Sequence, residues 1–328
     1  MHNKDLSILL TRKLPEPIEK KLDQKYNVIF NKQDKQLGYN ELKKKIKDIN
    51  ILVPCIGDTI DSSVIKSANE LRMIANFGNG VDNIDLITAK ENNILVSNTP
   101  EVLTEDTADI VITMLLMLSR NIKSAEKSLY EGKWFGWGPN KSHGQKIKGK
   151  KLGIIGMGRI GQAVSKRALT LGISINYHNR NRLSKTVEKK LNAKFWANLN
   201  DMLKSMDIIS IHCPYTPETF HLLSMRRLKL LKKNCIVINT SRGEIIDENA
   251  LASLLINKKI YGAGLDVFEN EPQVTPQLFE ADNVILLPHI SSSTYESRIA
   301  MGNRVLNNIE SFHKKGKPID IVTQNIIY

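Results

Sequence analysis

Short apolar runs alternate with helical patterns along this chain, in two successive series. Before residue 100 the apolar runs lie at 7–11, 27–30, 51–55, 72–77 and 94–97, with helical patterns near 40–47, 62–70 and 83–92. After residue 150 they lie at 152–155, 174–177, 208–213, 236–239, 263–267 and 284–287, again with helices between them. Such alternation predicts βαβ units on parallel sheets. Because 328 residues is roughly twice the length of a comfortable single domain, we expect an α/β protein of two doubly wound domains.

Composition excludes several classes of protein. Hydrophobic residues make up 41% of the chain and charged residues 25%, as in soluble globular proteins. The longest apolar stretch, 110–118, is shorter than the ~18 residues of a membrane span, and residues 1–13 lack the apolar core of a signal peptide. Cys55, Cys213 and Cys235 show neither CxxC spacing nor clustering with His, so we predict buried thiols, no disulfide and no metal. We therefore expect a soluble, cytoplasmic protein without a membrane partner.

The chain is strongly basic. It has 47 Lys and Arg against 34 Asp and Glu, which gives a net charge of +13. Such an excess is compatible with nucleic acid or with acidic small molecules as partners. The basic residues, however, are mostly lysines scattered among Asn and Ile, with only short clusters such as residues 43–45. This distribution is typical of solvated faces, and we predict no nucleic-acid partner.

The most specific local motif is the glycine-rich segment Gly156-Met157-Gly158-Arg159-Ile160-Gly161. It follows the apolar run 152–155 and leads into a helical pattern at 162–171. Glycine permits a tight turn at the first position, close approach of a pyrophosphate at the second and close helix packing at the third. The N-terminus of the helix adds unpaired N–H groups for phosphates. This context predicts a dinucleotide site; the alternative is a glycine-rich helix start with no ligand.

The position that commonly distinguishes NAD from NADP sites holds no acid. An NAD site carries Asp or Glu roughly 20 residues into the motif, to bind the ribose 2′-hydroxyl. Here Asn179 occupies that position, and Arg180 and Arg182 follow it. Arginine forks suit a 2′-phosphate, so we expect NADP(H) to be preferred, with NAD(H) possible. A merely basic surface loop is the alternative, and it leaves the missing acid unexplained.

Two long helices and an arm interrupt the alternation. Residues 104–121 begin with helix-start chemistry and are then apolar all round, and residues 294–314 form a second long helical pattern. The segment 122–150 between the two series is irregular and basic. It carries three closely spaced aromatic residues, Trp134, Phe135 and Trp137. An aromatic arm of this kind is expected to be buried in a twofold homodimer.

Three candidate catalytic residues, Arg242, Glu271 and His289, each stand just after an apolar run of the second series. Ligands gather at the carboxyl ends of strands in open α/β sheets. An arginine fork, an imidazolium and a carboxylate that orients it form a set suited to reducing a 2-oxo acid. Taken singly, Arg242 is equally well a surface ion pair, Glu271 a turn residue and His289 a capped loop histidine.

Together these motifs resemble the D-isomer-specific 2-hydroxyacid dehydrogenases. The glycine motif is followed by Asn239-Thr240-Ser241-Arg242-Gly243, then Gly264-Leu265-Asp266-Val267-Phe268 with Glu271-Pro272, then Pro288-His289, in the order and spacing of that family. The likeness covers nearly the whole chain, including residues 77–85. The arm and the Asn-Arg cofactor loop are most similar to the glyoxylate/hydroxypyruvate reductase branch, also called D-glycerate dehydrogenase.

The resemblance implies a role for each matching residue. Arg242 binds the substrate, Glu271 partners the histidine, and His289 is the acid/base. Asn79-Gly80 binds the substrate carboxylate through backbone N–H groups. The other implied substrate contacts are Ser292 and Trp137, the latter reaching the neighbouring subunit or else packing at the dimer interface. The other implied cofactor contacts are Thr107, Arg159, Ile160, Cys213, Pro214, Thr240 and Asp266, of which Asp266 holds the nicotinamide carboxamide.

Two positions depart from the usual pattern of the family. Asn79 stands where Val is most common, and Ser291 stands where Gly often follows the catalytic histidine. The first departure bears on the side chain presented to the substrate.

The resemblance also implies topology. It predicts a split, flavodoxin-like substrate domain at 1–103 plus 291–328 and a Rossmann domain at 104–290, joined by the two long helices as a hinge. The implied reaction is reduction of glyoxylate and hydroxypyruvate, with NADPH, to glycolate and D-glycerate.

Three alternatives remain open. Phosphoglycerate dehydrogenase is disfavoured because no room remains for a regulatory domain and the NAD-type acid is absent. Formate dehydrogenase is disfavoured because that branch has an amide where Glu271 stands. A corepressor-like, nucleotide-sensing protein can keep the same triad, but nothing here resembles a DNA-reading module.

Overall fold

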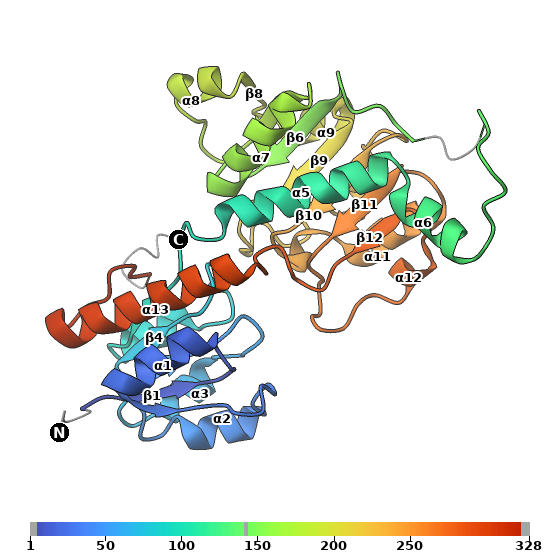
Figure 1. The fold of residues 1–328 in the computed structure, drawn as a ribbon. Coiled ribbons are helices and arrows are strands. Elements are labelled where there is room, and N and C mark those ends of the chain that lie inside the picture. Colours follow the sequence, from blue (N-terminus) through green and yellow to red (C-terminus); the bar gives the residue numbers. More distant parts are fainter. Residues whose placement is uncertain (1–4, 141–143, 323–328) are drawn as a thin grey trace. The chain divides into compact units, whose positions relative to one another are not determined.

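Two parallel sheets, each in its own compact unit, organise the computed structural model, which describes residues 5–140 and 144–322 (Figure 1). One unit comprises Met1–Leu103 with Ser293–Tyr328, and the other comprises Thr104–Ser292. The α/β class predicted from the alternation is confirmed. The second boundary lies two residues beyond the position expected from sequence.

The first unit is built on a five-stranded sheet in the order β2-β1-β3-β4-β5, with every pair parallel. The strands are β1 (Ser7–Leu10), β2 (Asn27–Ile29), β3 (Ile51–Val53), β4 (Met73–Ala75) and β5 (Leu95–Ser97). The helices are α1 (Glu16–Lys25), α2 (Tyr39–Lys45), α3 (Ser62–Lys66), α4 (Leu86–Glu91) and α13 (Tyr295–Lys315). Helix α13 returns from the end of the chain and packs on α1 and β4.

Helix α1 was not among the predicted elements. It buries only Ile18 and Leu22 among ten residues, so its apolar stripe is too narrow to give a helical period. Helix α13, by contrast, carries clear boundary signals. Thr294 caps it by accepting a hydrogen bond from the N–H of Ser297 at 3.1 Å, and Gly316 ends it with a φ of +72°.

The second unit is built on a seven-stranded, all-parallel sheet in the order β12-β11-β10-β9-β6-β7-β8. The strands are β6 (Lys151–Ile155), β7 (Ser174–His178), β8 (Ala193–Phe195), β9 (Ile208–Ile211), β10 (Ile236–Asn239), β11 (Gly262–Leu265) and β12 (Val284–Leu286). Strand β8, a three-residue edge strand, was not predicted. Its pattern of partly buried and exposed residues gives too short an alternation to detect.

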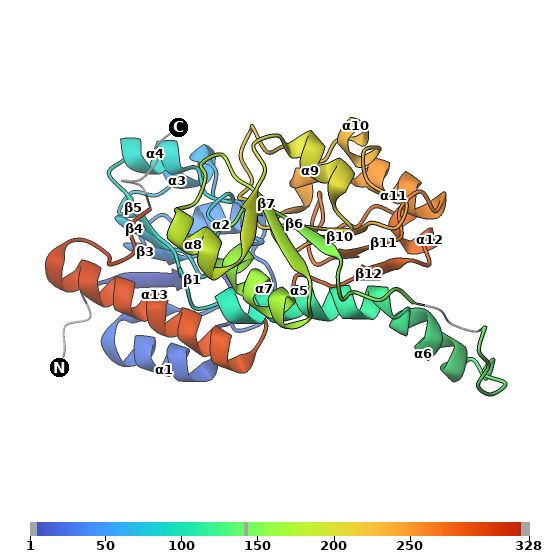
Figure 2. The same cartoon turned by 90° about the horizontal axis from the view of Figure 1, so that it is seen from above.

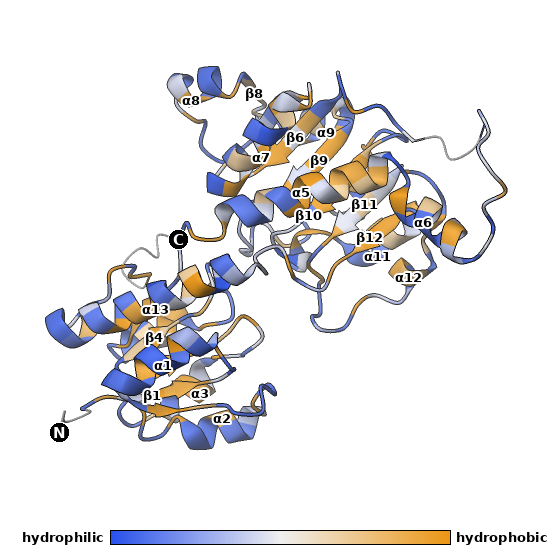
Figure 3. Ribbon diagram, in the orientation of Figure 1, coloured by the Kyte–Doolittle hydropathy of each residue, from blue (hydrophilic) through white to orange (hydrophobic). Residues whose placement is uncertain are grey.

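Helices cover both faces of this sheet. The helices of this unit are α5 (Thr104–Ser119), α6 (Ile122–Tyr130), α7 (Arg159–Thr170), α8 (Lys185–Lys190), α9 (Leu199–Ser205), α10 (Met225–Leu228), α11 (Glu248–Ile256) and α12 (Gln277–Glu280), with a 3-10 turn at Gly243–Ile245. Helix α5 packs on α7 and on β10, β11 and β12 (Figure 2). The strands are mainly hydrophobic and the outer helix surfaces mainly hydrophilic, as expected for a sheet buried on both faces (Figure 3).

The strand order of the second sheet reverses at β6. From β6 the chain adds β7 on one side and later returns to place β9 on the other. In open α/β sheets such a switch point forms a crevice at the carboxyl ends of the strands, where ligands bind. The glycine-rich loop, which follows β6, lies at this position.

The arm differs from the irregular segment that was expected. Its first part is the helix α6, which has no buried residues. The prediction missed it because the apolar positions of this segment face solvent rather than a core. Residues 141–143 of the arm lie outside the described residues. The aromatic part is strongly exposed in the single chain, with 87% of the surface of Trp137 accessible.

No helix in the described part of the chain is long and apolar enough to cross a membrane. Cys235 is buried, whereas Cys55 and Cys213 are only partly buried, and all three are free thiols. Within residues 5–140 and 144–322, no cluster of three or more His, Cys, Asp or Glu side chains could hold a metal ion.

Candidate active site

The glycine-rich loop joins β6 to α7. Gly156 has a φ of +95°, which favours glycine, and a Cβ there would collide with the backbone of Cys213. A Cβ on Gly161 would lie 2.6 Å from the carbonyl oxygen of Gly156, so the helix packs directly on the loop. Gly158 instead faces open space, and α7 begins after it without a side-chain cap. The first N–H groups of α7 are therefore open to an anion.

Asn179 follows β7 and contacts the glycine-rich loop. Its Oδ1 accepts a hydrogen bond from the N–H of Met157 at 2.6 Å. The amide thus ties the carboxyl end of β7 to the loop. Sequence reasoning considered only a ribose contact for this residue, because nothing in the local pattern reveals a partner 22 residues away.

Arg180 and Arg182 were predicted to clasp one phosphate together, but the structure does not bring them to a common partner. Arg182 donates two hydrogen bonds to the carboxylate of Glu188 on α8, at 2.9 and 2.8 Å. Arg180 has no hydrogen bond or ion pair among the described residues. Of the two, Arg180 is the side chain whose N–H groups make no hydrogen bond within the described residues.

Glu271 and His289 form a hydrogen-bonded pair, and the charge of Arg242 acts on Glu271. The Nδ1 of His289 is 2.8 Å from Oε2 of Glu271, whose Oε1 accepts the N–H of Phe268 at 3.1 Å. Burial alone would raise the pKa of Glu271, but the hydrogen bond and charge of His289, the N–H of Phe268 and the charge of Arg242 together lower it. With Nδ1 facing the carboxylate, the Nε2 atom of the ring is left for a substrate.

The backbone of His289 is held in the left-handed region, with a φ of +54°. This conformation costs a non-glycine residue roughly 1–3 kcal/mol. Asp266 stabilises this conformation, because its two oxygens accept hydrogen bonds from the N–H groups of Ile290 and Ser291 at 2.7 and 2.8 Å. The side chain of Asp266 is completely buried, which raises its pKa despite these bonds. Asp266 therefore supports the histidine loop, and its contact with the nicotinamide stays a prediction.

Glu248 is a supporting residue that sequence reasoning missed. It is buried at the start of α11, and its carboxylate accepts the N–H groups of Glu269 at 2.7 Å and of Thr275 at 3.3 Å. These two bonds fix both sides of the segment that carries Glu271. The sequence signal for this role is weak: Glu248 is an acidic residue at the start of an otherwise mainly apolar helix.

The Asn79-Gly80 turn belongs to the first unit, where it follows β4. The amide of Asn76 donates to the carbonyl of Gly80 at 2.7 Å, and the amide of Asn98 donates to the carbonyl of Asn79 at 2.8 Å. The N–H groups of Asn79 and Gly80 make no hydrogen bond within the described residues. Consecutive N–H groups presented by a turn suit an anion.

The other predicted contacts lie on elements that surround the crevice or in the arm. Arg159 and Ile160 begin α7, Cys213 and Pro214 follow β9, Thr240 follows β10, Ser292 follows the histidine loop, Thr107 is buried in α5, and Trp137 is in the arm. Thr240 is distinctive because its hydroxyl is buried without a hydrogen-bond partner among the described residues. A bound ligand is one group that can supply the missing partner of such a hydroxyl.

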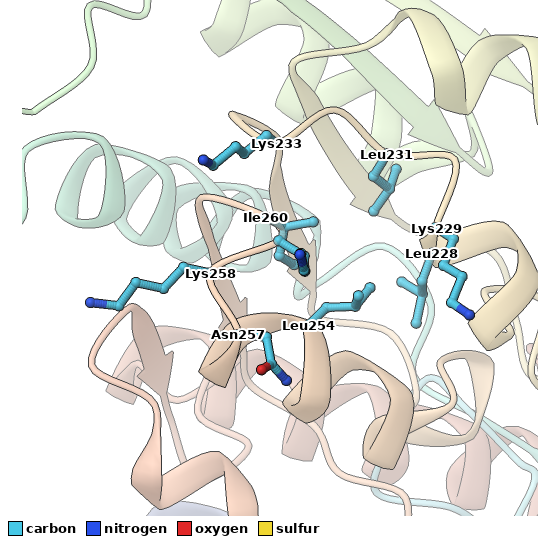
Figure 4. Close-up of a pocket in the computed structure, with 9 residues that line it drawn as sticks. Leu228, Lys229, Leu231, Lys233, Leu254, Asn257, Lys258 and Ile260 are labelled. Atoms are coloured by element: carbon cyan, nitrogen blue, oxygen red, sulfur yellow. The ribbon is translucent and has the colours of Figure 1, made fainter.

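A pocket elsewhere in the second unit is distinct from this site. It encloses about 490 Å³, with Leu228, Leu231, Leu254 and Ile260 beneath a rim of lysines (Figure 4). Its residues precede β10 and β11, at the amino ends of strands whose carboxyl ends lead to Thr240 and Asp266. Lys258 and Lys259 follow the C-terminus of α11, where they complement the helix dipole.

Together the two sheets, the switch-point loop and the carboxylate–histidine pair with its arginine define a dinucleotide-binding α/β oxidoreductase. Residues 112–291 match the family described as "D-isomer specific 2-hydroxyacid dehydrogenase, NAD binding domain". The chain belongs to the D-2-hydroxyacid dehydrogenase family, as its sequence motifs predicted.

Individual relatives agree with this assignment. The chain is 39% identical to a glyoxylate reductase of Pyrococcus horikoshii, over 98% of this chain and 96% of that protein. It superposes with a TM-score of 0.90 on a putative D-isomer specific 2-hydroxyacid dehydrogenase from Polaromonas, at 34% identity, covering 97% and 99% of the two chains. It is also similar to an NADPH-dependent glyoxylate/hydroxypyruvate reductase from Sinorhizobium meliloti, solved with NADP and malonate (TM-score 0.85, 31% identity, 97% and 96% coverage).

Proposed function

We propose that this enzyme reduces small 2-oxo acids, glyoxylate and hydroxypyruvate, to glycolate and D-glycerate, with NADPH as the preferred reductant. The observation that carries the proposal is the pair of Glu271 and His289 beside Arg242, on loops at the carboxyl edge of the dinucleotide-binding sheet. The names of the relatives from Pyrococcus and Sinorhizobium support the substrate class and, for the latter, the cofactor.

The residues of the second unit fit a nicotinamide dinucleotide. The open Gly158, the uncapped start of α7 and the unpartnered hydroxyl of Thr240 offer donors and space for its phosphates and ribose. The bound cofactor would supply the hydride that reduces the carbonyl carbon. We assign its 2′-phosphate to the loop after β7, where Asn179 replaces the acid of an NAD site and Arg180 is unpaired.

The side chains around the carbonyl would handle charge and the proton. The protonated ring of His289 donates its Nε2 proton to the oxygen as negative charge develops there, and Arg242 stabilises that charge. Glu271 orients the ring through Nδ1, and its carboxylate balances the positive charge of the protonated ring. The N–H groups of the Asn79-Gly80 turn bind the substrate carboxylate.

The aromatic arm supports assembly into a homodimer. Trp134, Phe135 and Trp137 are all more than half exposed in the single chain. Isolated soluble chains rarely expose so much contiguous aromatic surface, so a second copy would cover it. Trp137 either packs at that interface or contributes to the partner's substrate pocket.

A specificity profile tests the proposed reaction. Oxidation of NADPH and of NADH is followed with glyoxylate, hydroxypyruvate and pyruvate, and kcat/KM is compared for the six pairs. We expect the highest values for glyoxylate or hydroxypyruvate with NADPH. Absence of turnover with every 2-oxo acid would contradict the proposal and favour a nucleotide-sensing protein, whereas a preference for NADH would refute only the cofactor assignment.

A further inference from the structure

Arg182 contacts two side chains at the outer edge of the second sheet. Its Nε and Nη2 atoms donate to the two oxygens of Glu188, at 2.9 and 2.8 Å. Its guanidinium lies over the ring of Phe195 in β8, 5.5 Å from the centroid. Strand β8 is the last strand of the sheet, and α8 with Glu188 lies beside it (Figure 1).

Glu188 is itself fixed in place. The hydroxyl of Tyr177 donates to its Oε1 at 2.6 Å and accepts the N–H of Leu183 at 3.0 Å. Only 11% of the Glu188 side chain is exposed, against 57% of Arg182. The hydrogen bonds from Arg182 and Tyr177 lower the pKa of Glu188 to about 2, so the carboxylate is charged at every pH at which the enzyme would be assayed.

Arg180 interacts with a carboxylate in a different loop, Glu218. Its charge helps to lower the pKa of Glu218, after the hydrogen bond that Thr216 donates to that carboxyl. Glu218 lies in the loop after β9, and β9 and β7 flank β6 at the switch point. The charge of Arg180 thus acts towards the loop after β9, whereas Arg182 is bound at the edge of the sheet.

We propose that Glu188 determines cofactor specificity by binding Arg182 at the sheet edge, so that Arg180 alone carries the main contact with the 2′-phosphate. This inference rests on the proposed assignment of the 2′-phosphate to the loop after β7. Glu188 acts through Arg182 and not on the cofactor itself. It thus limits the preference for NADPH over NADH.

The substitution Glu188→Gln tests the inference. Glutamine has the same shape and keeps an oxygen for the hydroxyl of Tyr177, but it removes the charge that binds Arg182. The freed guanidinium adds a second cation to the loop after β7. A charge-assisted contact at such an exposed position is worth roughly a tenfold gain in affinity for a phosphate.

The experiment measures binding by calorimetry with two probes, 2′,5′-ADP and 5′-AMP, which differ only in the 2′-phosphate. We expect the ratio of their Kd values to rise about tenfold in favour of 2′,5′-ADP in Glu188→Gln. The double variant Glu188→Gln/Arg182→Gln should return to the parental ratio. Arg180→Gln should lose most of the preference for 2′,5′-ADP, and Arg182→Gln should change it little.

Controls separate specificity from charge and stability. Glu280→Gln, an exposed carboxylate on α12 of the same unit, changes the net charge equally and should leave the ratio unaltered. Thermal unfolding of each variant reports folding, whereas a merely structural role of Glu188 would weaken both probes together. The ratio of kcat/KM for NADPH and NADH should follow the ratio of the two probes.

An unchanged or reduced preference for 2′,5′-ADP in Glu188→Gln would overturn the inference. So would a loss in Arg182→Gln as large as that in Arg180→Gln, because Arg182 would then contact the phosphate in the parent. A parental enzyme that does not distinguish the probes would contradict the proposed NADPH preference instead. In that case the gain in Glu188→Gln still tests the role of Glu188.

Discussion

The substitution Glu271→Gln should move the alkaline limit of the reduction to lower pH. The carboxylate lies 2.8 Å from Nδ1 of His289, and the interaction with this ring contributes to lowering the pKa of Glu271. The ion pair exists only with the protonated ring, so it favours the form that donates the proton. Glutamine keeps the shape and one acceptor oxygen but removes the charge. The variant should therefore lose the proton-donating form at a lower pH than the parent.

The size of the shift follows from the exposure of the pair. A hydrogen bond between charged groups contributes roughly 1.5–3 kcal/mol. The side chains of His289 and Glu271 are 22% and 34% exposed, so solvent screening places the value near the lower end. Removal of this favourable interaction should move the alkaline limb to lower pH.

The assay is the pH dependence of kcat/KM for glyoxylate reduction, measured for the parent and the variant in buffers of constant ionic strength. The difference in rate between the two proteins should be smallest at acid pH, where protonation of the ring depends least on the carboxylate. An alkaline limb that stays in place would mean that Glu271 orients the ring without favouring its charged form. A loss of equal size at every pH would point to the same conclusion.

Three further predictions concern the same site and the arm. His289→Gln should lower kcat/KM by roughly 10²- to 10⁴-fold at every pH while 5′-AMP binds as in the parent, and near-parental turnover would remove this residue from the proposed reaction. Asp266→Asn leaves one N–H of the histidine loop without an acceptor, so it should lower the free energy of unfolding by about 1–3 kcal/mol. It should also lower kcat more than the affinity for 5′-AMP, and an unchanged kcat would refute the supporting role. Light scattering should show a dimer at micromolar concentration, and replacement of Trp134 and Phe135 by Ser should weaken it, whereas a monomeric parent would contradict the interface.

Much of the fold could be predicted because it depends on local pattern. Five of the seven strands of the second sheet are four or five residues long, and the glycine-rich loop follows the first of them directly. The elements that were missed lack such a pattern. Helix α1 buries two residues, helix α6 buries none, and β8 has three residues at an edge. In each case few apolar side chains face a core, so the sequence carries almost no periodic signal.

The sequence predicted which residues belong to the candidate site but not the contacts that hold them. Arg242, Glu271 and His289 could be found because each lies in a loop that follows a strand, and the topology of a parallel sheet places such loops at one edge. The partners of Asn179, Arg182 and Asp266 could not be found, because they are backbone N–H groups or side chains that only the folded loops bring into contact. The pairing of Arg182 with Glu188 is the clearest case, since from sequence both arginines were equally good candidates for a phosphate.

The buried carboxylate of Asp266 lowers stability, but it holds the loop of His289 in place. The left-handed backbone of His289 would be relaxed with glycine, but glycine has no imidazole to hold a proton. The chain instead imposes this conformation on histidine through the two hydrogen bonds to Asp266, each worth about 1.5–3 kcal/mol when the acceptor is charged. Their sum exceeds the roughly 1–3 kcal/mol of backbone strain. Burial raises the pKa of Asp266, so the charged acceptor is itself formed at a cost in free energy. The buried carboxylate thus lowers the stability of the fold in exchange for a rigid loop at His289. This loop directs the ring towards Glu271, and a proton donor needs a fixed orientation.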